Sequence, residues 1–110
     1  MNWLGLLAAL SGALAIGAGA FGAHGASERA ASLLRTGGEY QLIHAVAALV
    51  ALQLGARGPG WMFVAGAGLF AGSLYVLALG GPRWLGPVTP LGGMVMIAGW
   101  LWLALEMARW

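Results

Sequence analysis

The sequence has no cysteine, no lysine and no aspartate, and charged residues make up only 7% of its 110 positions. Without cysteine the chain has no disulfide, no thiolate metal ligand and no thiol nucleophile. The five basic residues are all arginines and are spread along the chain, so no basic cluster is present for binding nucleic acid. The first charged side chain is Glu28, and the preceding uncharged stretch is long enough to cross a bilayer.

Most of the sequence consists of apolar residues. Hydrophobic side chains account for 61% of the sequence, and the mean hydropathy is +0.87. A water-soluble protein of this size cannot bury such a composition, because a small globule leaves much of its surface exposed. At about 20 residues per crossing, the apolar stretches provide for roughly four membrane helices. The sequence therefore predicts an all-α membrane protein with one domain, residues 1–110.

Four apolar segments define the expected crossings: Trp3 to Ala23, Tyr40 to Ala56, Trp61 to about Gly80, and Thr89 to Glu106. The second segment closes at Gly55, and the fourth opens with Thr89 as an expected helix cap. Two connections are short and rich in Gly and Pro, which predicts antiparallel hairpins.

The connection from Gly25 to Gly38 has a different composition. Ser27 is a typical helix cap, Glu28 favours a helix N-terminus, and Gly37 is a possible stop. Alanines and leucines between them give one apolar side. We expect a short interfacial helix here, lying on the membrane surface between the first and second crossings.

The small residues from Gly19 to Ala23 also resemble a signal-peptide cleavage site. However, Met1 to Trp3 contain no basic residue, and the apolar run is longer than the hydrophobic region of a usual signal peptide. We therefore expect the first segment to be a retained membrane helix.

Small residues at regular spacing predict where helices pack, because lipid gives helices no hydrophobic reason to associate. We expect these glycines to pack inside the bundle rather than at a dimer seam, so that Gly68→Leu or Gly72→Leu would disrupt it. The expected packing positions are Gly12, Gly19, Gly68, Gly72, Gly92 and Gly99.

The few polar side chains map to one membrane face when the four segments alternate in direction. A polar group near hydrocarbon needs a partner, so we expect a cluster with a structural or partner-binding role. Tyr40 and His44, four residues apart, share a helix face, which places His44 roughly one turn below the interface. The cluster comprises His24, Glu39, Tyr40, His44, Ser73, Tyr75 and Thr89.

Three interpretations of this cluster stay open. His24, His44 and Glu39 could bind a metal, although Glu39-xxxx-His44 is not a typical ligand spacing. The two histidines could relay protons. In the structural interpretation, which we favour, the side chains join helix ends by hydrogen bonds. We accordingly expect no catalytic residue, no metal and no cofactor.

Five sequence blocks resemble a known family in the same order along the chain. The chain is similar to the YgdD-like family, a domain of unknown function found in small bacterial inner-membrane proteins. This resemblance implies four transmembrane helices and cytoplasmic termini, and it carries no established activity. The blocks are Gly19–Gly25, Thr36–Ala45, Gly72–Tyr75, Thr89–Gly93 and Gly99–Trp100.

Taken together, these features favour a protein that is not an enzyme. We expect an accessory or structural subunit of a larger inner-membrane complex, with the lipid bilayer and other membrane-protein subunits, or a second copy of itself, as partners and no nucleic acid. The alternative is a small homo-oligomeric transporter or proton conduit that uses His44 and Glu39.

Overall fold

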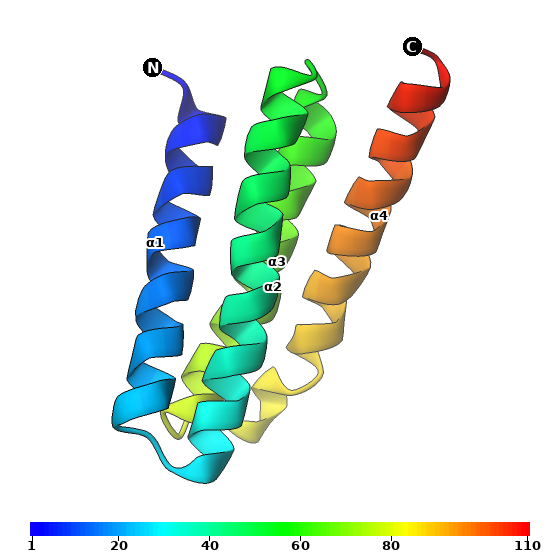
Figure 1. Cartoon of the computed structure of the whole chain (residues 1–110). Helices are drawn as coiled ribbons and strands as arrows, with labels where there is room; N and C mark the ends of the chain where they lie inside the picture. The colour runs from blue at the N-terminus through cyan, green and yellow to red at the C-terminus, as the bar shows by residue number, and fades with distance from the viewer.

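The computed structural model describes all residues 1–110 and contains only helices and short connections. The elements are α1 (Trp3–His24), α2 (Glu28–Gln53), α3 (Arg57–Ala78), the short 3-10 helix η1 (Arg83–Leu85) and α4 (Val88–Ala108). Consecutive α-helices run in opposite directions (Figure 1). Both termini therefore lie at one end of the molecule, called the termini end below. The α1–α2 and α3–α4 connections lie at the other, the loop end.

Three helical stretches are long and apolar enough to cross a membrane. They are α1, α3, and the stretch Arg83–Ala108 that contains α4. The longest helix, α2, is not among them; its first half carries all four of its charged residues, and Gln41, His44 and Gln53 follow. The all-helical class is therefore confirmed, and three of the four expected crossings have the length and composition of a membrane span.

The expected interfacial helix is wrong. Residues 28–53 form one continuous helix, so the surface helix and the second apolar segment are a single element. Ser27 does cap it, with its Oγ accepting the N–H of Ala30 at 3.2 Å. Gly37 and Gly38 do not end the helix but are buried in its middle. A Cβ on Gly38 would lie 3.0 Å from the carbonyl oxygen of Ala15 in α1, so this pair serves close helix packing.

The other helix ends follow the sequence more closely. Gly55 and Gly80 have φ values of +76° and +90°, which glycine adopts at little cost. The residue after each glycine donates its N–H to a carbonyl five residues back, and this bond caps α2 and α3. The expected stops there are confirmed.

The expected starts of the third and fourth segments need correction. The third helix begins at Arg57 rather than Trp61. The expected cap at Thr89 is wrong: α4 begins at Val88, and the Thr89 hydroxyl bonds to Ser73 of α3 instead.

The helices form an open arrangement rather than a closed bundle. Helix α3 packs extensively on α2 and on α4, α1 packs on α2, and α4 packs mainly on α3. Figure 1 shows α4 standing apart from α1. Only 23 of the 110 residues are buried, so most of each helix faces outward. The main core cluster consists of Leu4, Ala8, Ala48, Ala51, Ala56 and Phe63.

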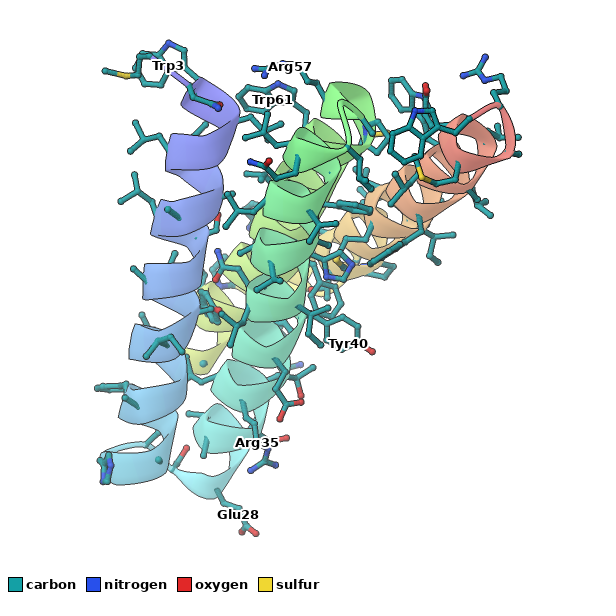
Figure 2. The ribbon with its side chains drawn as sticks, turned by 45° about the horizontal axis from the view of Figure 1, so that its top comes forward. Trp3, Glu28, Arg35, Tyr40, Arg57 and Trp61 are labelled. Atoms are coloured by element: carbon teal, nitrogen blue, oxygen red, sulfur yellow. The ribbon has the colours of Figure 1, made fainter.

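Aromatic and charged residues mark the two ends. Trp3 and Trp61 lie at the termini end, and Glu28 lies at the loop end (Figure 2). Tryptophan prefers the boundary between hydrocarbon and water. The positions of Trp3 and Trp61 therefore fit a molecule whose long axis crosses the membrane.

Two of the expected packing glycines lie in tight contacts between α3 and α4. A Cβ on Gly92 would lie 2.7 Å from the carbonyl oxygen of Gly66, and one on Gly99 would lie 3.0 Å from the ring of Phe63. A Cβ on Gly12 would meet α2 only at an ordinary 3.9 Å.

The expected internal packing of Gly68 and Gly72 is wrong. A Cβ added at either would meet nothing within 4 Å. The reason is geometric: α3 meets its neighbours through Gly60 and Gly66, so the Gly68-xxx-Gly72 stripe points away from them. Glycines four residues apart identify a helix face without side chains, but the spacing does not determine whether that face points to another helix or outward. Gly19 also has open space at its own Cβ position, but its backbone nitrogen lies 3.7 Å from the Cβ position of Gly38, so its backbone is close to α2.

Candidate functional site

His44 is the most constrained polar residue of the molecule. It lies on α2, is 6% exposed, and uses both ring nitrogens. Trp100 of α4 donates its indole N–H to Nε2 of His44 at 3.0 Å. Because indole can only donate, Nε2 must accept, and the ring proton resides on Nδ1. Nδ1 then donates to the carbonyl oxygen of Tyr40 at 2.7 Å. The hydrogen bonds thus assign a neutral imidazole that connects α2 to α4.

Aromatic rings surround this bond. The ring of Phe63 meets His44 edge-on at 5.6 Å between centroids and meets Trp100 at 4.6 Å. Tyr40 stacks over His44 at 6.4 Å and contacts Phe70 at 4.9 Å. These rings hold the imidazole in an apolar setting, where a hydrogen bond is stronger than in water.

This arrangement opposes proton transfer through His44. A second ring proton on Nε2 would place two N–H donors against each other, His44 and Trp100. Protonation would therefore require the α2–α4 bond to break. The geometry suits a structural connection better than a relay.

Two more hydrogen bonds join helices. The hydroxyl of Tyr75 on α3 donates to Oε1 of Gln41 on α2 at 2.7 Å, and Gln41 is only 3% exposed. Ser73 on α3 donates to the carbonyl oxygen of Phe70 at 2.8 Å. Since Ser73 has one hydroxyl hydrogen, Thr89 on α4 must be the donor in their mutual bond. No buried side-chain nitrogen or oxygen lacks a hydrogen-bond partner.

Comparison with known proteins places the chain in a family. The family model "Protein of unknown function (DUF423)" matches residues 18–93. The chain belongs to this family. A UPF0382 membrane protein of Staphylococcus haemolyticus is 36% identical over 92% of the chain and 91% of its own length. YwdK of Bacillus subtilis, also a UPF0382 membrane protein, is 36% identical over 96% of the chain and 95% of its own.

A third relative extends the match to the family expected from the sequence. The UPF0382 inner membrane protein YgdD of Escherichia coli is 39% identical over 86% of the chain and 81% of its own length. The resemblance to a YgdD-like family is therefore confirmed, and these relatives are named membrane proteins. No solved structure matches the chain.

In this member of the DUF423 family, the predicted polar residues form pairs rather than one cluster. Tyr40 lies beside His44, and Ser73 bonds to Thr89. Tyr75 bonds to a residue outside the predicted set, Gln41. His24 lies exposed at the end of α1, and Glu39 lies exposed on α2; neither forms a side-chain hydrogen bond.

The structure separates the residues that a metal site or a conduit would need to share. Glu39 lines a groove of about 340 Å³ between α1 and α2. His44 lines a different groove of about 390 Å³, formed by residues of α2, α3 and α4. No group of three or more His, Asp or Glu side chains lies close enough to hold a metal ion. The alternative based on His44 and Glu39 together therefore has no common site.

His44 lies farther from the start of its helix than the expected start at Tyr40 implied. Because α2 begins at Glu28 and not at Tyr40, His44 lies about 24 Å along the helix from its first residue, at 1.5 Å per residue. Trp100 lies about 18 Å from the start of α4 on the same scale. Their bond joins the helices near mid-height, not at one rim.

Two residues of this network, Gln41 and Trp100, fall outside the predicted site. A signal exists for each in the sequence. Gln41 is an amide beside an apolar run, and such a group needs an internal partner in lipid. Trp100 lies in the middle of an apolar helix, away from the ends where tryptophan usually occurs.

Proposed function

We propose that this protein is a non-enzymatic accessory subunit that packs against other proteins of the bacterial inner membrane. The observation that supports this most is the use of its internal polar groups. Gln41, His44 and Ser73, the buried polar side chains, are all engaged within the chain. None of these buried groups is left free to react or to exchange its bond, as catalysis or proton conduction through the interior of the bundle would require.

The outward faces support a packing role. Large apolar side chains are exposed along all four long helices, and glycines with open space lie among them on α1 and α3: Gly17, Gly19, Gly68 and Gly72. Glycine lets another helix approach closely in lipid, where van der Waals packing drives association. Helix α4 packs mainly on α3, so much of its surface is left for a neighbour.

In this proposal α2 is the fourth crossing. Its charges are confined to residues 28–39, and the rest of the helix to Gln53 carries none. Both α1 and α3 pack along it, so its polar residues Gln41 and His44 are shielded from lipid. A helix protected in this way can cross with a lower hydropathy than one that faces lipid on all sides.

Location and orientation come from the relatives and the family. The Escherichia coli relative is named an inner membrane protein, which supports the same membrane for this chain. The cytoplasmic placement of both termini follows the family analogy. Charge does not decide the orientation, because Arg29, Arg35 and Arg83 lie toward the loop end and Arg57, Arg109 and the amino terminus lie at the other.

Purification from native membranes tests the proposal. The tagged protein, expressed at its natural level, is extracted both in mild detergent and in polymer-bounded lipid discs, with an untagged strain as the control. We expect the same membrane proteins to co-purify in fixed ratio by both routes. Recovery of a monomer alone under every mild condition would contradict an accessory role.

A further inference from the structure

The α1–α2 groove contains two charged side chains that have no partner in the chain. Arg35 and Glu39 lie one turn apart on α2 and line the groove together with Ala15, Ile16, Gly19, Ala20, Gly38 and Leu42. The only ion pair of the molecule joins Arg109 to Glu106 at the termini end. Figure 2 shows Arg35 on the side of α2, well above Glu28 at the end of the helix.

Glu39 lies deep along the apolar length of α1. Its neighbour Gly38 packs against Ala15, with the added Cβ 3.0 Å from the Ala15 carbonyl oxygen. Ala15 is about 14 Å from His24, the last residue of α1, at 1.5 Å per residue. With α1 crossing the membrane as proposed, an unpaired carboxylate at this depth lies beside hydrocarbon, which is costly and marks a position where a partner is expected.

We propose that the α1–α2 groove is a self-association face, on which two copies pair Arg35 of each with Glu39 of the other. This inference deepens the proposed function by naming the partner of one face. Copies inserted in the same orientation are related by a two-fold axis along the membrane normal, so equivalent residues lie at equal depth. Arg35 and Glu39 differ in depth by about 6 Å, one helical turn, which an extended arginine side chain covers.

The composition of the face fits a second copy. It carries one cation and one anion, so it is complementary to itself, and each pair forms twice across the axis. A Cβ on Gly19, which lines the groove, would meet nothing within 4 Å, so another helix can approach the backbone of α1 there. A lipid headgroup would satisfy Arg35 near the interface but would leave Glu39 unpaired below it.

Charge reversal in the purified protein tests the pairing. Two differently labelled preparations are mixed in lipid vesicles, and association is followed by energy transfer as the protein is diluted with lipid. We expect Arg35→Glu and Glu39→Arg each to weaken association about tenfold or more, because a paired charge loses its partner. The double variant R35E/E39R restores both pairs and should return association to the wild-type level. Arg29→Glu, an exposed charge on the same helix, is the matched control and should change nothing.

Cross-linking locates the face independently. The chain has no cysteine, so a single introduced thiol reports one position. Ala20→Cys, in the groove, should form a disulfide-linked dimer on oxidation. Leu101→Cys on α4, which is 62% exposed, should not.

Three results would overturn the inference: a wild-type protein that stays monomeric in vesicles, a dimer that neither charge reversal weakens, or a double variant that fails to reassociate. Circular dichroism of each variant distinguishes loss of pairing from unfolding. Because Arg35 and Glu39 are both exposed in the single chain, we expect every variant to keep its fold. If other subunits still co-purify from native membranes, only the self-association face is wrong. If the dimer forms and no other subunit is found, the accessory role is wrong instead.

Discussion

At the scale of single residues, the molecule uses its few polar groups as connectors between helices. His44 is the clearest case, because its Nε2 bonds to Trp100 of α4 while its Nδ1 bonds to the Tyr40 carbonyl of its own helix. In hydrocarbon a polar group cannot form a hydrogen bond with water instead. Each such bond therefore avoids the free-energy cost of an unsatisfied polar group and also adds an attraction between helices.

The His44–Trp100 bond can be tested by removing its donor. Trp100→Phe keeps an aromatic ring but leaves Nε2 of His44 without a hydrogen bond. We expect the free energy of unfolding to fall by about 1–2 kcal/mol, measured by denaturant titration in detergent. Trp84→Phe is the control, since Trp84 is 67% exposed and should change stability by less than about 0.5 kcal/mol. Equal effects of the two substitutions would mean that the bond contributes nothing.

Denaturant titration in detergent can also test which glycines lie in tight helix contacts. Gly92→Ala would place a methyl group 2.8 Å from the Cα of Phe70 and 2.7 Å from the Gly66 carbonyl oxygen, both backbone atoms that cannot turn aside. We expect a loss of about 3 kcal/mol, at the upper end of the usual cost of overpacking.

Gly72→Ala is the matched substitution, with open space around the new methyl group. Its unfolding free energy should stay within about 0.5 kcal/mol of the wild type in dilute detergent. A large loss at Gly72 and none at Gly92 would reverse the packing assigned to α3.

At the scale of helices, α2 shows where prediction from sequence succeeds and where it fails. Its end at Gly55 is predictable, because a left-handed residue after a helix is a local requirement that glycine meets. Its continuity through Gly37 and Gly38 is not. Glycine is also a packing residue in membrane helices, and only the neighbouring backbone of α1 and the ring of Tyr75 distinguish the two roles.

The candidate site likewise has features that the sequence predicts and features that it does not. That Tyr40 and His44 share a face follows from their four-residue spacing within one helix. The partners Gln41–Tyr75 and His44–Trp100 depend on how each helix is rotated about its axis. Helices α1 and α4 are apolar on every side, so periodicity does not fix that rotation.

The connection between α2 and α3 can be measured with a double-mutant cycle. Tyr75→Phe removes the donor and Gln41→Leu removes the acceptor of the 2.7 Å bond. Each single substitution should destabilise the protein, and the double should cost less than their sum by about 1 kcal/mol, the coupling energy of the bond. Additive effects would show that the two side chains do not interact in the folded protein.

At the scale of the whole molecule, the arrangement resembles a sheet of helices more than a closed bundle. The long helices pack mainly in chain order, α1 on α2, α2 on α3 and α3 on α4, with a smaller contact from α1 to α3. Outer faces with open glycines, and the unpaired Arg35 and Glu39, are left for contacts beyond the chain. The whole interpretation depends on α2 crossing the membrane, since otherwise the loop end would not be a single surface.

Side-specific labelling of single cysteines tests that crossing most directly. Gly25→Cys and Gly86→Cys lie in the two loop-end connections, and Trp110→Cys lies at the opposite end. A membrane-impermeant maleimide is applied to sealed vesicles of known orientation. We predict that the Gly25 and Gly86 variants react from the same side and the Trp110 variant from the other. Labelling of Gly25→Cys and Gly86→Cys from opposite sides would contradict four crossings and the function built on them.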